Sequence, residues 1–383
     1  MVGVWTYPWT LYEEGVDTAF ETFTSHGITS VSVATHHHSA RILQPRFPDS
    51  LFERRPAGCY FAPQAEHFDR TPLSPIQNEI EAVSDPLGEI TAVADEYNVR
   101  TNGWMVTLHN SRLGATYPSF QIEDAFGTGH EHALCPSHPE VREYFAGVAA
   151  ELVDRGVDAI ELEAAGYPLV FHGHDTVYGH EAQQVLSSDA ERRLFSQCFC
   201  DACQRQARDF DVDLEQARER TLEIIERSFR DPASQTVPLS ALVREESVLT
   251  ELFEFRAAII ERLIESIATS AGDTTVNVYV RRAEANWPAG RTLDGLAAHA
   301  DRLTVLCYVA DPAVARDRLS AITRRVSLPI DAGVTLDPSI IENESELVSL
   351  VDEIRTVIDG RVSVYNHAML TETQLEWIEQ IAT

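Results

Sequence analysis

Short apolar runs recur along this chain and alternate with stretches in which apolar residues follow the helical period. The clearest run covers residues 157–163. Ile160 and Leu162 share one face of this predicted strand, and Glu161 and Glu163 share the other, because successive side chains of a strand point to opposite sides. One face therefore packs against an apolar layer, and the other presents two carboxylates. Seven further strands are predicted, over residues 3–7, 28–35, 101–108, 274–280, 303–308, 328–333 and 361–367.

Helical patterns separate these strands and predict a fold of the α/β class; they include residues 14–25, 86–97, 313–325 and 344–358. Eight strands that alternate with helices are typical of a (β/α)8 TIM barrel and not of an open doubly wound sheet. We expect one catalytic barrel domain over residues 1–383, with long loop insertions after strands 2 and 4, at about residues 39–86 and 167–272. The second insertion contains two predicted amphipathic helices, over about residues 214–230 and 239–270.

The charged residues are strongly biased toward acids. The chain has 60 acidic and 30 basic residues, a net charge of −30, and all 30 basic residues are arginine. Such a charge repels nucleic acid and anionic membranes, and salt at about 1 M relieves the self-repulsion by shortening the Debye length to about 3 Å. We interpret this composition as that of a cytoplasmic protein of a salt-accumulating halophile. An ordinary acidic protein would explain the charge but not the missing lysine.

The absence of lysine excludes several kinds of enzyme. Schiff-base aldolases, pyridoxal-phosphate enzymes and P-loop nucleotide hydrolases all need a lysine amine. No stretch reaches the roughly 18 apolar residues of a membrane span, and the N-terminus does not have the pattern of a signal peptide. We therefore expect a soluble, intracellular protein with reduced or metal-bound cysteines. A small molecule is the expected partner, and a homo-oligomer is compatible with the composition.

A cluster of cysteines is the clearest candidate for a metal site. Cys198, Cys200 and Cys203 lie within six residues, and Cys135 is a candidate for a fourth ligand. Zn²⁺ prefers four thiolates in closed structural sites. The alternative is a set of reduced thiols packed in the core. A metal here would join the segment after strand 4 to the loop after strand 3.

These motifs resemble a known family. The sequence Leu-Cys-Pro-Ser-His-Pro at residues 134–139, a strand that ends in Glu163, and the Cys-x-Cys-x-x-Cys pattern resemble the β-galactosidases of glycoside hydrolase family 42 and related hypothetical glycoside hydrolases with a barrel fold. The resemblance covers residues 101–203 by motif and the rest by the order of strands. It implies a structural Zn²⁺ bound by the four cysteines and a general acid/base at Glu163. The chain departs from the family at Leu162, where the family has Asn, and at Asp331, where it has a glutamate nucleophile.

The resemblance also suggests hydrolysis of a glycoside by two carboxyl groups. These groups stand about 5 to 5.5 Å apart in retaining enzymes and about 6.5 to 9.5 Å apart in inverting ones. Because Glu161 and Glu163 project from one strand, the partner is expected across the barrel. We expect Glu163 to act as proton donor and then base and Asp331 as nucleophile. Glu161 would assist Glu163 or bind a sugar hydroxyl, or would instead form an ion pair with Arg281. Further candidates for the nucleophile are Glu284, Asp311 and Asp337.

Several residues near the strand ends suit the binding of a sugar. Aromatic faces pack on the C–H groups of a sugar ring, and polar side chains bind its hydroxyls. The candidates are Tyr7, His109, Asn110, Arg281, Trp287, Tyr365 and Asn366. For the aromatic candidates, packing in the barrel core is the alternative. Arginines near the predicted loops are compatible with an acidic sugar; they are Arg41, Arg46, Arg112 and Arg281.

Two other functions stay open. Histidines could bind a divalent metal together with the carboxylates, as in metal-dependent sugar isomerases and lyases. The histidines concerned are His36, His37, His38, His172 and His174. A non-catalytic carbohydrate-binding barrel would keep the aromatic residues and would not need an opposed pair of carboxylates.

Overall fold

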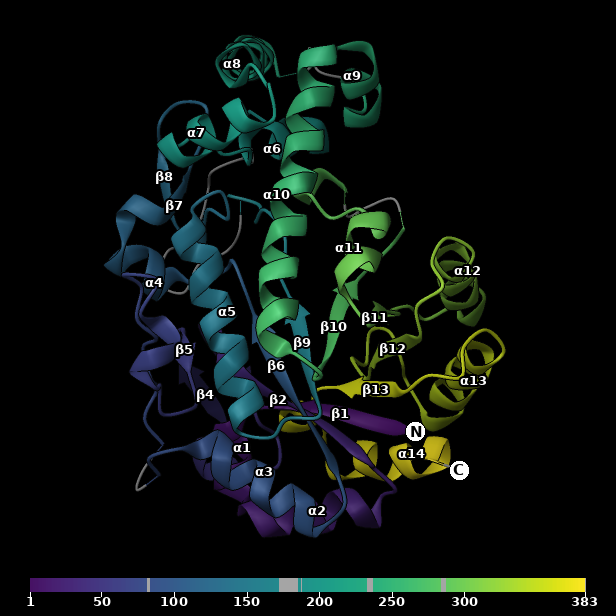
Figure 1. The fold of residues 1–383 in the computed structure, drawn as a ribbon. Coiled ribbons are helices and arrows are strands. Elements are labelled where there is room, and N and C mark those ends of the chain that lie inside the picture. The colour runs from purple at the N-terminus through teal and green to yellow at the C-terminus, as the bar shows by residue number, and fades with distance from the viewer. Residues whose placement is uncertain (81–82, 172–184, 187, 233–236, 284–286, 383) are drawn as a thin grey trace.

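Eight parallel strands form a closed barrel in the computed structural model, which describes residues 1–80, 83–171, 185–186, 188–232, 237–283 and 287–382 (Figure 1). The strands pair in sequence order, and β1 also pairs with the last strand, which closes the ring. They are β1 (Val2–Thr6), β2 (Ser30–His37), β6 (Arg100–Val106), β9 (Ala159–Glu163), β10 (Thr275–Val280), β11 (Arg302–Leu306), β12 (Ile330–Thr335) and β13 (Val362–Tyr365). The predicted (β/α)8 TIM barrel is confirmed.

Helices surround the barrel, and all of those named next except the C-terminal α14 lie between successive strands (Figure 1). These helices are α1 (Pro8–Glu14), α2 (Val16–Ser25), α3 (Pro86–Glu96), α5 (Pro139–Asp154), α10 (Ser247–Ala271), α11 (Leu293–His299), α12 (Pro312–Thr323), α13 (Glu344–Arg355) and α14 (Glu372–Ala382). The longest is α10, with 25 residues, and it packs beside α5. No helix in the described part of the chain combines the length and the apolar character that crossing a membrane requires.

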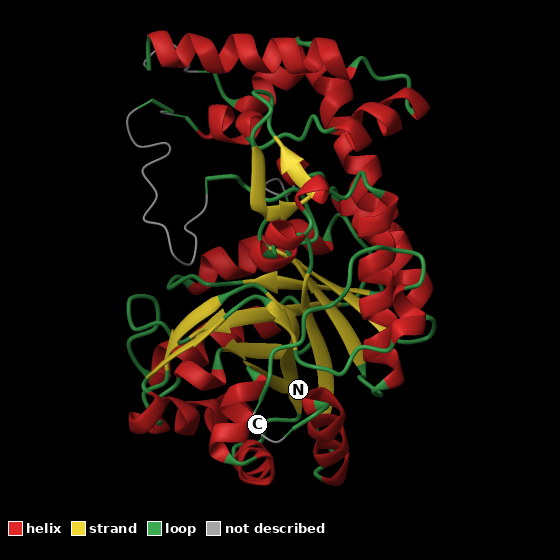
Figure 2. Cartoon of the chain, turned by 90° about the vertical axis from the view of Figure 1, so that its left-hand side faces the viewer, coloured by secondary structure: helices red, strands yellow, loops and turns green. Residues whose placement is uncertain are grey.

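The connections after β2, β6 and β9 contain further elements. After β2 come β3 (Ala40–Leu43), β4 (Phe52–Arg55) and β5 (Gly58–Cys59), and after β6 come α4 (Ser111–Thr116), β7 (Gln121–Glu123) and β8 (Gly129–Leu134). Between β9 and α10 lie α6 (Asp189–Phe195), α7 (Asp201–Asp209), α8 (Leu214–Arg230) and α9 (Leu239–Glu245). Helices α6 to α9 form a layer beyond one end of the barrel, at the top of Figure 1 and Figure 2. Short 3-10 helices occur at η1 (Pro48–Ser50), η2 (Ala65–Phe68), η3 (Pro118–Phe120), η4 (Trp287–Ala289) and η5 (His367–Met369).

Alternation along the strands decides which side chains face the interior of the barrel. In β10, Val276 and Val278 are buried in the apolar layer between strands and helices. Asn277 and Tyr279, which alternate with them, point inside: Asn277 lines a cavity at the amino end of the barrel, and Tyr279 belongs to an aromatic cluster at the other end. The predicted division between an apolar outer face and a polar inner face is confirmed for this strand.

Candidate active site and cysteine cluster

Two adjoining cavities open at the carboxyl ends of the barrel strands, and Glu163 lines both. The outer cavity has a volume of about 560 Å³ and the inner cavity about 170 Å³. Besides Glu163, the inner cavity is lined by Trp5, Trp104, Tyr279, Arg281, Leu306, Tyr308 and Tyr365. Because TIM barrels carry their active sites at this end, these two cavities form the candidate active site.

Glu163 is held at the junction of the two cavities by its neighbours on β6. It is the last residue of β9, and its side chain is half-buried. Its Oε2 accepts a hydrogen bond of 2.7 Å from the Trp104 indole N–H, and its backbone carbonyl accepts one of 2.9 Å from the Thr107 N–H. The next residue, Ala164, has a φ of 53°, in the left-handed region that side chains other than glycine rarely adopt. The strand therefore ends sharply here and leaves the Glu163 carboxylate facing the cavities.

Glu161 lies one level deeper in the barrel, fully buried. Its carboxylate accepts hydrogen bonds from the Tyr279 hydroxyl and from the Arg361 guanidinium, with which it forms an ion pair. Burial, followed by the negative charge of Glu161, raises the pKa of Tyr279 well above the ordinary tyrosine value, so the hydroxyl stays protonated and donates. Glu161 thus does form an ion pair, but the predicted partner Arg281 is wrong, because Arg281 lies at the rim of the cavities and the partner is Arg361.

Four arginines line the outer cavity: Arg193, Arg281, Arg282 and Arg291. Glu163 is the one acidic residue among the described residues that line it. Burial and the nearby charges of Arg281 and Arg193 together lower the pKa of Arg291 to about 10, although the charge of Glu163 acts in the opposite direction. The Arg291 guanidinium also donates a 3.0 Å hydrogen bond to the backbone carbonyl of Tyr279. Among the described lining residues, arginines therefore outnumber the one carboxylate.

Tyrosine hydroxyls give the inner cavity an uncharged polar surface. Burial raises the pKa of Tyr365 to about 12 and the pKa of Tyr308 well above the ordinary value, and the charge of Glu163 contributes in both cases. The ring of Tyr365 lies 6.0 Å from those of Trp5 and Trp104. The inner cavity is thus an aromatic pocket with neutral hydroxyls, the Glu163 carboxylate and the Arg281 guanidinium. Flat apolar surfaces with a few polar groups suit the binding of a sugar ring.

Three of the predicted sugar-binding residues, His109, Arg281 and Tyr365, line these cavities. Tyr7 lies beneath them, where its ring stacks on Trp9 with a centroid distance of 4.3 Å and its hydroxyl is 3.1 Å from that of Tyr365. Tyr7 therefore supports the wall of the inner cavity from behind.

The other predicted sugar-binding residues have contacts within the fold, and none is among the described residues that line the two cavities. Asn110 caps α4, since its Oδ1 accepts a 2.9 Å hydrogen bond from the N–H of Leu113. Asn366 begins η5 in the same way, with a 3.0 Å hydrogen bond from the N–H of Ala368. Trp287 packs edge-on against the Phe253 ring, 5.0 Å away. Asn110 and Asn366, which both lie just past strand ends, are thus explained by capping.

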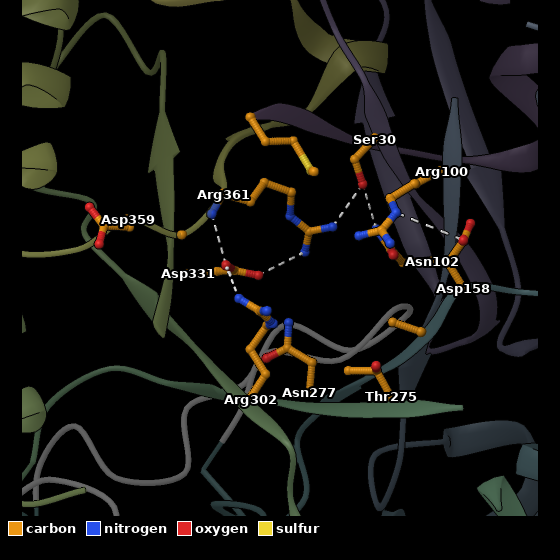
Figure 3. A pocket seen from close by; sticks show the side chains of 13 residues that line it. Ser30, Arg100, Asn102, Asp158, Thr275, Asn277, Arg302, Asp331, Asp359 and Arg361 are labelled. Carbon is orange, nitrogen blue, oxygen red and sulfur yellow. Dashed lines mark hydrogen bonds and ion pairs between the residues drawn. The ribbon is translucent and has the colours of Figure 1, made fainter. Parts of the chain in front are cut away.

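Asp331 lies at the opposite end of the barrel from Glu163. Figure 3 shows it between Arg302 and Arg361. Because β12 begins at Ile330 and not at residue 328, Asp331 is near the start of its strand, which corrects the prediction that it ends the strand. Its carboxylate pairs with Arg302 at 2.9 Å and with Arg361 at 3.6 Å. It lines a third cavity, of about 210 Å³, at the amino ends of the strands. Asp331 and Glu163 therefore do not face each other.

The further candidates for the nucleophile do not line the two cavities either, as far as the chain is described. Asp311 caps α12 with a 2.9 Å hydrogen bond from the N–H of Ala313, and Asp337 accepts a 2.7 Å hydrogen bond from the Ser339 hydroxyl. Glu284 lies outside the described residues. Among the described lining residues, Glu163 is the single carboxylate of the candidate active site.

The predicted metal-binding histidines are divided among different environments. His36 is buried; its Nδ1 is 2.7 Å from the Val106 carbonyl, and burial lowers its pKa to about 4, so it is neutral. His37 is also buried, whereas His38 lines the outer cavity. His172 and His174 lie outside the described residues. In the described part of the chain, the one group with the geometry of a metal site is the cysteine cluster.

The four cysteines predicted to bind a metal lie together. Their sulfur atoms are buried and within 4.8 Å of one another. The Cys135 sulfur is 3.6 Å from that of Cys203 and 3.7 Å from that of Cys200. A tetrahedral zinc with bonds of about 2.3 Å to sulfur would hold its ligands about 3.8 Å apart, whereas a disulfide needs about 2.05 Å. The arrangement of Cys135, Cys198, Cys200 and Cys203 is therefore compatible with a four-thiolate metal site.

Hydrogen-bond donors next to the cluster stabilise negative charge on two of its sulfur atoms. Arg256 of α10 is fully buried, and its guanidinium donates a 3.2 Å hydrogen bond to the Cys203 sulfur. The N–H of Glu123 donates to the Cys198 sulfur at 3.3 Å. Four thiolates around a divalent cation leave a net charge of about −2, which a buried guanidinium partly compensates. Through these contacts the cluster joins the β7–β8 region to α7 and α10.

Sequence reasoning missed several residues of the site, and only one of those discussed here carried a usable signal. Trp104 lies in a predicted strand, and because side chains alternate along a strand, this position would have been placed inside the barrel. By contrast, Arg193, Arg282, Arg291 and Arg256 come from helices and loops where no period marks a side chain that faces a cavity or a metal. These arginines were recognisable only after the chain segments had been brought together.

The sequence matches no family model, and no curated protein sequence matches it. Among solved structures, α-L-fucosidase isoenzyme 2 from Paenibacillus thiaminolyticus is 13% identical with a TM-score of 0.51, over 96% of this chain and 45% of that one. A β-galactosidase from the psychrophilic Marinomonas ef1 is 10% identical with a TM-score of 0.55, over 100% and 58% of the two chains. A β-galactosidase from Bacillus circulans sp. alkalophilus is 13% identical with a TM-score of 0.53, over 99% and 55%. The chain spans about half the length of these structures, and at such identities the likeness shows the fold alone.

Proposed function

We propose that this protein is a glycoside hydrolase in which Glu163 protonates the leaving group. The observation that carries the proposal is the position of Glu163, the one carboxylate among the described residues of two cavities at the carboxyl end of a TIM barrel. A sugar ring packed on the aromatic residues of the inner cavity would place its glycosidic bond beside this carboxylate. The fold shared with a fucosidase and two β-galactosidases supports the same reaction class.

In the proposed reaction Glu163 transfers a proton twice. In its acid form it donates a proton to the glycosidic oxygen while the bond from that oxygen to C1 breaks, so that the alcohol leaves with the electron pair and C1 becomes an oxocarbenium ion. The resulting carboxylate, stabilised by the Trp104 N–H, then takes a proton from the water that attacks C1. The proposal gives Asp331 and Glu161 no part in these proton transfers, because both are ion-paired with Arg361 away from the junction of the cavities.

The substitution Glu163→Gln tests this role. We expect kcat on glycosides with poor leaving groups to fall by about 10²- to 10⁴-fold, the usual contribution of a general acid. For aryl glycosides with strongly acidic leaving groups, we expect bond cleavage to be much less affected, because such leaving groups need no protonation. A set of aryl glycosides assayed in concentrated salt measures both effects.

Glu226→Gln is the matched control, since Glu226 is an exposed residue of α8 that lines neither cavity. This variant should keep the activity of the unmodified protein. Full activity of Glu163→Gln on poor leaving groups would refute the assignment. Sugar binding by the unmodified protein without any turnover would make the protein a carbohydrate-binding barrel instead.

We also propose that the cysteine cluster binds one structural Zn²⁺. A structural zinc contributes directly to folding. Elemental analysis of the purified protein should therefore find about one zinc per chain, and Cys200→Ser should lose most of it and unfold at a lower temperature. Cys307→Ser is the control, because Cys307 is a buried cysteine outside the cluster. A protein that folds and stays stable without any bound metal would contradict the proposal.

The composition supports a proposal about where the enzyme works. An acidic chain without lysine suits concentrated salt, in which the self-repulsion is screened. We infer a cytoplasmic enzyme of a halophile that acts on a small or imported glycoside.

A further inference from the structure

We propose that Tyr167 is a positioning residue through which the cysteine cluster fixes one wall of the outer cavity. This inference rests on the proposed function, because the outer cavity would receive the part of a glycoside that lies beyond the bond beside Glu163. Tyr167 follows Glu163 by four residues and lines the outer cavity, yet it is only 4% exposed. Its hydroxyl contacts residues next to the cysteine cluster, so this residue connects the two sites.

One wall of the outer cavity is formed by residues 164–169, which directly follow β9 and which we call the post-β9 segment. Five of its six residues line the cavity, and the segment belongs to no helix or strand. Few backbone hydrogen bonds hold it: the Gly166 N–H donates to the Ala164 carbonyl at 2.8 Å, and the Tyr167 N–H donates to the Ala289 carbonyl at 2.9 Å. The position of such a segment depends on its side-chain contacts.

Two buried groups connect the Tyr167 hydroxyl to the cysteine cluster. The Ser137 hydroxyl oxygen lies 3.2 Å from the Tyr167 hydroxyl and 3.2 Å from the Cys203 sulfur. The Arg256 guanidinium lies 3.5 Å from the same hydroxyl and 3.2 Å from the same sulfur, and it stands over the Tyr167 ring at 5.0 Å from the ring centre. Ser137 and Arg256 are fully buried, so water does not compete for these contacts.

Packing of the Tyr167 ring does not require these contacts. A phenylalanine would fill the same space, and the hydroxyl adds hydrogen bonds to two groups that both contact Cys203. The cluster is a suitable fixed point, because its cysteines come from residue 135 and from residues 198–203 and a bound metal would hold both segments together. A binding site must be held to within about 0.5 Å, which a wall connected to such a point achieves.

Hydrogen exchange of backbone amides tests the inference. In Tyr167→Phe, which keeps the ring, the amides at positions 166 and 167 should exchange about tenfold faster than in the unmodified protein, because a buried hydrogen bond that holds the segment is lost. The zinc content should stay the same, since the hydroxyl is not a metal ligand. Ser137→Ala should accelerate the same amides, and the double variant should exchange no faster than Tyr167→Phe, because both changes remove the same connection.

The matched control is Tyr144→Phe. The Tyr144 hydroxyl is also buried and lies 3.1 Å from the His36 Nε2, but Tyr144 lines neither cavity. This variant loses a buried hydroxyl in the same way and should leave the exchange of the post-β9 segment unchanged.

Sugar affinity tests whether the wall serves binding. The probes are galactose with lactose and glucose with cellobiose, measured with Glu163→Gln to exclude turnover. We expect added Tyr167→Phe to weaken the binding of at least one disaccharide by about fivefold and to leave the monosaccharides unchanged. The reason is that only a disaccharide extends from the inner cavity into the outer one.

Unchanged exchange at positions 166 and 167 in Tyr167→Phe, or the same acceleration in Tyr144→Phe, would overturn the inference. An equal loss of affinity for monosaccharides and disaccharides would also overturn it, because Tyr167 would then only stabilise the fold. If none of the four sugars binds, the exchange measurements decide. If exchange accelerates as expected but hydrolysis does not depend on Glu163, the proposed function fails and the role of Tyr167 stands. If hydrolysis requires Glu163 and exchange is unchanged, the role of Tyr167 fails and the glycosidase stands.

Discussion

Both ends of the barrel place arginines and carboxylates around a cavity, but the two ends differ in how these charges are matched. At the amino end, the cavity is lined by three arginines and three aspartates: Arg100, Arg302, Arg361, Asp158, Asp331 and Asp359. Figure 3 shows several of them pointing at one another, with Asp331 between Arg302 and Arg361. At the carboxyl end, four arginines face one carboxylate among the described lining residues.

The matched charges at the amino end hold the fold together. A buried charge is tolerated when an opposite charge and hydrogen bonds compensate it, as they do for Asp331. Its Oδ1 also accepts a 2.8 Å hydrogen bond from the backbone N–H of Arg361. Residue type alone therefore does not identify a functional site in this barrel. The balance of charge in each cavity is the informative property.

The largest expected effect comes from breaking the matched end. Asp331→Ala should lower the free energy of unfolding by about 3 kcal/mol, because it removes the buried carboxylate that Arg302 and Arg361 share. The loss stays at the lower end for a broken buried ion pair because Arg361 keeps its ion pair with Glu161 and the Arg302 side chain is 34% exposed. Chemical denaturation measures this loss. Activity per folded molecule should stay the same, since Asp331 does not line the candidate active site.

Arg281→Gln is the matched change at the other end, and it should alter the free energy of unfolding by no more than about 0.5 kcal/mol, as is usual for exposed positions. If Asp331→Ala instead abolished activity and left stability intact, Asp331 would act in catalysis and the contrast between the two ends would not hold.

A smaller effect is expected on the pH dependence of stability. It tests whether His36, a buried polar residue at the carboxyl end of β2, stabilises the fold. His36 has its pKa lowered to about 4 by burial, while a histidine in the unfolded chain has a pKa near 6.5. As the pH falls below about 6.5, His36 of the unfolded chain binds a proton, whereas His36 of the folded protein stays neutral until about pH 4. The stabilising contribution of neutral His36 is thus complete above about pH 6.5 and is lost as the pH falls toward 4, by roughly 3 kcal/mol in all.

His36→Gln should therefore lose less stability between about pH 6.5 and 4. The slope of its unfolding free energy against pH should correspond to about one proton fewer taken up on unfolding. Denaturant titrations of both proteins at several pH values measure this slope. His26→Gln is the control, because His26 lies only part-buried at the end of α2. An unchanged slope in His36→Gln would mean that His36 is protonated in the fold or plays no part in its acid sensitivity.

Much of the fold was predictable, because each barrel strand has a local signature. Every predicted strand overlaps an observed one, and the predicted helix over residues 214–230 is α8, Leu214–Arg230. The predicted helix over residues 239–270 is instead two helices, which meet at Glu246 between α9 and α10. Apolar periodicity reports the burial of a face and is insensitive to a short break of this kind.

The candidate site was predictable only in part, because strand ends are the least certain feature of a sequence. The observed β12 lies two residues later in the sequence than the predicted strand, so Asp331 lies at the opposite end of the barrel from the expected active site. Each residue advances a strand by about 3.3 Å, so a small error in a boundary is comparable to the dimensions of a site. Glu163 was less affected because β9 does end at this residue.

By itself, the sequence determined the alternation of strands and helices, the inward face that carries Glu161 and Glu163, and the proximity of Cys198, Cys200 and Cys203. These features depend on residues close together in the chain, where the period of a strand or a helix relates side chains directly. Only the tertiary structure decided that Glu161 pairs with Arg361, that Cys135 joins the cluster, and that arginines from α6 and from the loops after β10 surround Glu163. Coulomb interactions and metal geometry act between groups that are close in space, and closure of the barrel brings together residues far apart in the sequence.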